Sequence, residues 1–184
     1  MCDVFMLLTL WEVLQAILLS LILGWLFSDL LPSMSERKRF ALSIASVAPA
    51  VILHELAHKL VALSFGLHAV FTVPWVFVLI AVILKLARSP FLFLVPAFVA
   101  IQGVLTPFTS MLIAAAGPGM NLFLALIFTI LERSALTEHA PYDTLLFITL
   151  SRNVNLFLGI FNLLPIPGFD GWKVFTALIT LLTG

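Results

Sequence analysis

The chain has 184 residues, of which 62% are apolar and only 10% are charged, so its composition excludes an ordinary soluble domain and indicates an integral membrane protein. Nine basic and nine acidic residues give a net charge of zero, so no basic field favours nucleic acid as a partner. Cys2 is the only cysteine, which excludes an intramolecular disulfide and a cysteine-based zinc site, so a metal would require histidine and carboxylate ligands.

At about 20 apolar residues per crossing, the length allows about six transmembrane or re-entrant segments in a single membrane-embedded domain over residues 1–184. Residues 5–31 lack the basic start and cleavage pattern of a signal peptide and predict a first span. The polar run at 35–39 predicts a loop. Residues 40–65 predict a second span that ends at Gly66. Pro49 should kink or restart this helix, with Ser43, Ser46 or a neighbouring element satisfying the freed carbonyl.

The stretch at 70–108 is apolar but interrupted by prolines, and two interpretations stay open. Its first part, 73–86, fits a tilted or re-entrant helix, whereas 91–101 fits a strand pair or a second short insertion. Further along, the sequence predicts spans over 111–131 and 144–164, a polar loop over 132–143, a non-helical run over 165–171 and a helix over 172–183. The expected fold is an all-α polytopic membrane protein with a possible short β hairpin between the second span and the span at 111–131.

The sequence His-Glu-Leu-Ala-His at 54–58 places three ionisable groups inside the second span. Such groups cost several kcal/mol each in a bilayer unless they are paired or bound, so they predict a functional site. On a helix, His54 and His58 face the same way and can bind one Zn²⁺ at about 2.0–2.1 Å. Glu55 lies about 100° round the helix from His54, which suits a general base. A hydrogen-bonded packing network of these side chains is the alternative without a metal.

A catalytic zinc needs a third protein ligand and an open position. Most acidic residues lie near span ends or in loops, whereas Asp170 stands between two apolar stretches and is the best candidate. The run at 162–171 breaks the helix, which a membrane tolerates only where protein or a wet cavity surrounds the backbone. Its extended backbone could also pair with a substrate strand.

Three motifs together resemble the site-2 protease family of intramembrane zinc metalloproteases. They are His-Glu-x-x-His at 54–58, Gly-Pro-x-x-Asn at 117–121 and Asn-x-x-Pro-x-Pro-x-x-Asp-Gly at 162–171, and their order and spacing fit over residues 40–184. The resemblance implies one zinc per chain held by His54, His58 and Asp170, with Glu55 activating the hydrolytic water, Asn162 contacting the substrate backbone or reacting carbonyl, and Asn121 and Asn155 supporting the core. The strongly apolar 70–108 stretch departs from the more polar segment of many members.

The expected function is hydrolysis of peptide bonds within transmembrane segments of membrane-protein substrates, by a multi-pass protein of the cell membrane. A membrane metal transporter or sensor using the same cluster is the alternative from another class. A membrane protease that cuts outside the bilayer and uses a glutamate as third ligand is a further one.

The orientation in the membrane receives opposing indications. The resemblance places the zinc nearer the cytosolic face, with the His58 end of its helix inward, whereas the positive-inside rule places residues 37–39 in the cytosol. The orientation that the resemblance implies is favoured by Lys59, Lys85, Arg88 and Lys173. Arg152, inside a span, could pair with an acidic residue such as Glu12 or Asp29, but snorkelling or a structural ion pair is the favoured expectation.

Overall fold

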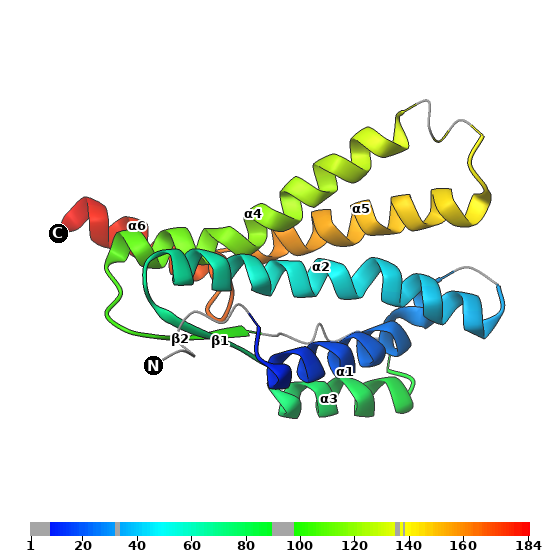
Figure 1. The fold of residues 1–184 in the computed structure, drawn as a ribbon, viewed down its shortest axis with the longest axis horizontal. Coiled ribbons are helices and arrows are strands. Elements are labelled where there is room, and N and C mark those ends of the chain that lie inside the picture. Colours follow the sequence, from blue (N-terminus) through cyan, green and yellow to red (C-terminus); the bar gives the residue numbers. More distant parts are fainter. Residues whose placement is uncertain (1–7, 32–33, 90–97, 135–136, 138) are drawn as a thin grey trace.

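A computed structural model describes residues 8–31, 34–89, 98–134, 137 and 139–184. Its elements, in chain order, are α1 (Leu10–Phe27), the short 3-10 helix η2 (Ser28–Leu30), α2 (Glu36–Ser64), β1 (His68–Thr72), α3 (Trp75–Leu86), β2 (Phe98–Gln102), α4 (Pro107–Glu132), α5 (Tyr142–Asn162) and α6 (Asp170–Thr183). Cys2 lies outside the described residues. The helices α1, α2, α4 and α5 lie side by side along the long axis, and β1, β2 and α6 gather at the end that also holds the C-terminus (Figure 1).

Four of these helices, α1, α2, α4 and α5, are long and apolar enough to cross a membrane. The remaining two are shorter, because 12 residues in α3 and 14 in α6 span about 18 and 21 Å at about 1.5 Å per residue. A bilayer core is about 30 Å thick, so α3 and α6 do not reach across it. The protein is therefore an all-α polytopic membrane protein, as the sequence predicts.

The helix that carries the histidines, α2, differs in two ways from its prediction. It begins at Glu36, so residues 36–39 form its first turn and the predicted loop at 35–39 is wrong there. It also continues through Pro49 without a restart, and the buried hydroxyls of Ser43 and Ser46, which were expected to satisfy the freed carbonyl, have no hydrogen-bond partner among the described residues. The expected end is confirmed, because Gly66 takes a positive φ of 73° and its N–H donates to the Leu63 carbonyl.

The predicted β hairpin takes the form of a two-stranded antiparallel sheet. β1 pairs with β2 in the register Phe71 opposite Val99. The two strands are not joined by a tight turn, because α3 lies between them in the chain. The prediction of a short helix over 73–86 is confirmed by α3, and the prediction of strand structure over 91–101 is confirmed only for its last part, since residues 90–97 lie outside the described residues.

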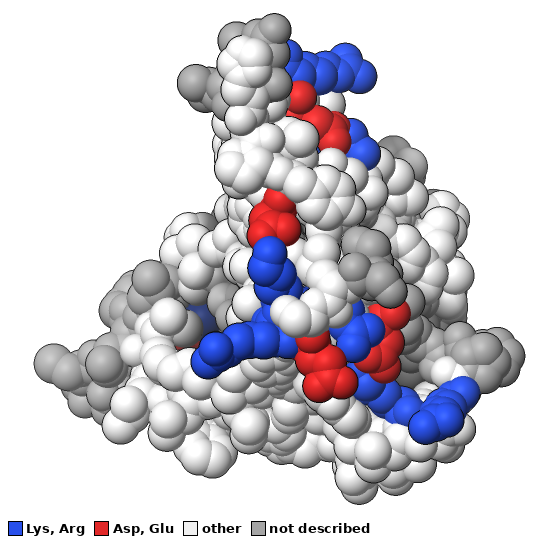
Figure 2. Space-filling model, turned by 90° about the vertical axis from the view of Figure 1, so that its right-hand side faces the viewer, with Lys and Arg blue, Asp and Glu red and all other residues white. Residues whose placement is uncertain are grey.

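Charged side chains gather at the end of the bundle opposite the sheet (Figure 2). Lys85 belongs to this end, because its Nζ donates to the Leu26 carbonyl at the end of α1 and pairs with Asp29 at 3.2 Å. Lys85 therefore lies at the same end of the bundle as residues 37–39. It does not favour the orientation that the resemblance implies, in which the zinc lies nearer the cytosolic face. Arg152 pairs with Glu132, so the expected structural ion pair is confirmed, and its partner is neither Glu12 nor Asp29.

Candidate metal centre

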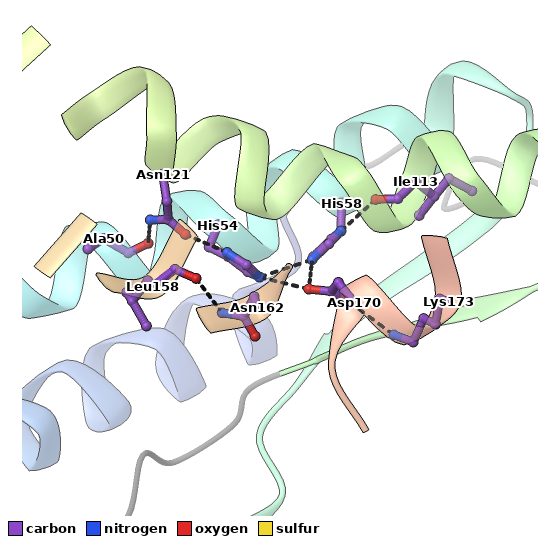
Figure 3. A network of polar contacts seen from close by, with 9 residues as sticks. All are labelled: Ala50, His54, His58, Ile113, Asn121, Leu158, Asn162, Asp170 and Lys173. Carbon is purple, nitrogen blue, oxygen red and sulfur yellow. Dashed lines mark hydrogen bonds and ion pairs between the residues drawn. The ribbon is translucent and has the colours of Figure 1, made fainter. Parts of the chain in front are cut away.

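Three side chains from two distant parts of the chain converge inside the bundle (Figure 3). His54 and His58 stand one turn apart on α2, and their Nε2 atoms are 3.1 Å from each other. Asp170, the first residue of α6, places its Oδ2 atom 3.2 Å from His54 Nε2 and 3.1 Å from His58 Nε2. The three side chains are buried. Around a tetrahedral zinc with bonds of about 2.0–2.1 Å, ligand atoms lie roughly 3.3–3.4 Å apart, so this triangle matches a zinc site closely.

The hydrogen bond between His54 and Asn121 determines which ring nitrogen of His54 can bind a metal. Asn121 of α4 donates its Nδ2 to the Ala50 carbonyl at 3.0 Å and to Asn155 Oδ1 at 2.9 Å. Its Oδ1 therefore faces His54 Nδ1, at 2.5 Å, and accepts the proton of that nitrogen. The Nε2 lone pair of His54 is thus left to point into the triangle.

His58 is oriented in the same way by a main-chain group. Its Nδ1 lies 2.6 Å from the carbonyl oxygen of Ile113 on α4, so this nitrogen donates and Nε2 presents a lone pair. When both imidazoles are neutral, the centre of the cluster contains two imidazole lone pairs and one carboxylate oxygen, with no hydrogen to bridge them. Such a set of acceptors fits a divalent cation far better than it fits a hydrogen-bonded packing network.

Gly117 on α4 leaves the space in front of these nitrogens. A Cβ at this position would lie 2.6 Å from His54 Nε2 and 2.7 Å from His58 Cε1, and closer still to His58 Nε2. No side chain larger than hydrogen therefore fits there without displacing the two rings. The Gly-Pro-x-x-Asn element thus contributes twice to the site, through the missing side chain of Gly117 and through the amide of Asn121.

The loop between α5 and α6 brings Asp170 to the cluster. The chain turns at Gly168, which has a positive φ of 99°, and Phe169 packs edge-on against Phe161 of α5 with ring centroids 4.8 Å apart. Gly171 follows immediately, and a Cβ there would lie 2.5 Å from the Leu164 carbonyl oxygen, so the helix start fits closely against the loop. A carboxylate in the first turn is also favoured by the helix dipole. The predicted non-helical run therefore ends at Phe169 rather than at Gly171.

The second carboxylate oxygen of Asp170 faces away from the histidines. Lys173, one turn along α6, places its Nζ 3.2 Å from Asp170 Oδ1. The two oxygens of the carboxylate thus have different partners, and only Oδ2 belongs to the triangle.

The two further predicted site residues lie close to the cluster in the chain but form no hydrogen bond with its three side chains among the described contacts. Glu55 is buried, and its Oε2 has no hydrogen-bond partner among the described residues. Asn162, at the end of α5, donates its Nδ2 to the Leu158 carbonyl of its own helix at 3.0 Å. In Figure 3 the dashed line from the Asn162 amide leads to Leu158 and not to the triangle.

A buried ion pair adjoins the site, and the sequence did not predict it. Lys59, the residue after His58, is 2% exposed and pairs with Glu12 of α1, which is fully buried. Glu12 also accepts the N–H of Phe71 at 2.6 Å, and Gln15 accepts the N–H of Val73 at 3.2 Å. The signal in the sequence was the pair of charges inside two apolar spans, which require each other as partners.

The chain has relatives among known proteins. It is 38% identical over 137 residues to a protein of Methanocaldococcus jannaschii named "Putative zinc metalloprotease", covering 73% of this chain and 69% of that protein. It is 30% identical over 135 residues to a protein of Synechocystis with the same description, covering 73% of this chain and 30% of that longer protein. No family model and no solved structure matches. With the cluster of His54, His58 and Asp170, these relatives identify zinc as the metal. The chain belongs to the zinc metalloprotease family that these relatives represent.

Proposed function

We propose that this protein is an intramembrane protease of the site-2 type, which hydrolyses peptide bonds within transmembrane segments of membrane-protein substrates. The observation that carries the proposal is the position of the cluster, because two of its three residues lie on a helix that is long and apolar enough to span the membrane. Residues 1–184 would act as one membrane-embedded unit, in a multi-pass protein of the cell membrane with the lipid bilayer and single-span proteins as its partners.

His54, His58 and Asp170 would hold the zinc, with Asn121 and Ile113 orienting the two imidazoles. When bound, zinc supplies a Lewis acid that polarises the substrate carbonyl and makes water acidic enough to deprotonate near neutral pH. Glu55 would accept the proton of that water, since its Oε2 has no competing hydrogen bond among the described residues. Asn162 would use the second N–H of its amide to donate to the reacting carbonyl oxygen, because Leu158 occupies only one.

A substrate helix hides its carbonyls in its own hydrogen bonds, so the scissile stretch must unwind before attack. Helix-breaking residues in the substrate would lower this cost. The rival function, metal transport, requires a series of sites along a path, whereas the described residues contain one cluster able to hold a metal ion. This favours catalysis over transit.

The deciding experiment combines metal analysis with cleavage of a single-span peptide in lipid nanodiscs. Wild type should contain one zinc per chain and cut the peptide within its apolar segment. Glu55→Gln should retain the zinc and lose cleavage, because the ligands are unchanged and the base is absent. Asp170→Ala should lose both. Cleavage by Glu55→Gln, or cleavage only outside the apolar segment, would refute the proposal.

A further inference from the structure

A cavity of about 160 Å³ lies between α1 and α2. Its wall includes Val13, Ala16 and Ser20 from α1, Ile52 and Glu55 from α2, and Phe71 from β1. Apart from Glu55 and the neighbouring Lys59, its lining is apolar or small. The mechanism proposed above uses only one of these residues, Glu55, and leaves the cavity itself without a role.

The residue Glu55 borders this cavity and also adjoins the metal centre in the chain. Glu55 adjoins the ligand His54 in the chain, and it also forms part of the cavity wall. Its Oε2 has no hydrogen-bond partner among the described residues, although it is buried. A group that enters the cavity therefore contacts the residue that we propose as the general base.

Two small residues of α1 create the space. Ala16 and Ser20 stand one turn apart, so they share a face of the helix. The Ser20 hydroxyl donates to the Ala16 carbonyl at 2.6 Å within α1, so a ligand does not need to accept a hydrogen bond from it. A longer side chain at either position would fill part of the cavity.

The buried contacts next to the cavity hold α1 at its distance from α2. Glu12 binds both Lys59 of α2 and the Phe71 N–H of β1, and Gln15 binds the Val73 N–H. Because breaking a buried ion pair is costly, α1 cannot close the space by a small shift. The cavity is therefore preformed, which favours binding of a rigid apolar group.

On the basis of the proteolytic function proposed above, we infer that this cavity is the subsite for a large apolar side chain, leucine or phenylalanine, on the substrate residue beside the scissile bond. A cavity of about 150 Å³ is large enough to hold benzene, so a phenyl or isobutyl group matches the space. The side chain leaves lipid rather than water, so packing contacts supply the preference. Ala16 and Ser20 are the residues that determine specificity, because they set the volume.

The first test compares peptides of about 25 residues that span a nanodisc and differ only in the residue beside the cleaved bond, as alanine, leucine or phenylalanine. Wild type should prefer phenylalanine over alanine by about tenfold in kcat/KM. Ala16→Leu and, independently, Ser20→Leu should remove this preference, by lowering kcat/KM for the phenylalanine peptide to about the value for the alanine peptide. Leu18→Phe, on the exposed face of the same helix, is the matched control and should retain the preference. A preference that survives both cavity-filling variants, with zinc content intact, overturns the inference.

The second test does not depend on cleavage. A peptide with a photoreactive leucine analogue at the variable position is irradiated with Glu55→Gln, and the labelled residues are mapped by mass spectrometry. Label within residues 13–20 or 52–59, lost in Ala16→Leu and kept in Leu18→Phe, supports the subsite. Label elsewhere, or label unaffected by Ala16→Leu, means that lipid occupies the cavity and overturns the inference. Failure of wild type to cleave any peptide would refute the proposed function separately from this result.

Discussion

Replacing Gly117 by alanine tests whether α4 shapes the metal centre. The added Cβ would lie 2.6 Å from His54 Nε2, whereas ordinary contacts begin at 3.4 Å, so that ring would have to move by roughly 0.8 Å and His58 by more. Metal sites tolerate deviations of only about 0.2 Å in ligand distance. Neither ring can yield freely, because Asn121 and the Ile113 carbonyl hold the other nitrogens. We therefore expect zinc affinity to fall at least about a hundredfold.

The assay is a competition between the purified protein and a zinc chelator, together with circular dichroism to verify the helical fold. Gly119→Ala is a control on the same helix, since a Cβ there meets nothing within 4 Å. This control should bind zinc like wild type and gain a little stability, because alanine favours a helix over glycine by about 1 kcal/mol. If Gly117→Ala keeps wild-type affinity, the arrangement of α4 against the histidines is wrong.

Three further predictions concern residues around the centre. Asn121→Ala should weaken zinc binding by about 10–100-fold in the same competition assay, because His54 loses the acceptor that orients it, and unchanged affinity would contradict that role. Glu12→Gln should lower the thermal unfolding midpoint strongly, since Lys59 stays buried without its counterion at a cost of about 3–5 kcal/mol. The double variant Glu12→Gln with Lys59→Met should recover most of this loss. Equal midpoints for wild type, the single variant and the double variant would refute the pairing. Lys38→Ala should leave the midpoint nearly unchanged, because its ion pair is more than one third exposed, and a large decrease would show that this pair matters.

The sequence predicted well the features that depend on spacing along one helix. His54 and His58 face the same way because four residues complete about one turn, and no tertiary information is needed. The placement of Asp170 was predicted from its isolation between apolar stretches and from the resemblance, and the structure brings it to the histidines. The same approach predicted the end of α2 at Gly66, where a positive φ results from local chemistry.

Features that depend on packing between distant segments were not predictable in this way. The role of Gly117 depends on how closely α4 approaches α2, and a sequence does not state that distance. The ion pair of Arg152 was predicted but its partner was not, because Glu132 lies 20 residues away on the adjacent helix and several acidic residues were equally available. The residues at 36–39 were assigned to a loop because of their charge, yet charged residues extend α2 beyond the apolar region.

The buried pair between Glu12 and Lys59 also constrains how the protein is assembled. The ribosome delivers α1 to the membrane before α2, so the Glu12 carboxylate reaches the bilayer without its lysine, and charged groups in that position are costly. The Phe71 N–H of β1, which also donates to the Glu12 carboxylate, arrives later still, after the whole of α2 has been synthesised. The first helix therefore takes its final position only when the metal-binding helix and the strand behind it have arrived, and it cannot be exchanged for a generic apolar anchor.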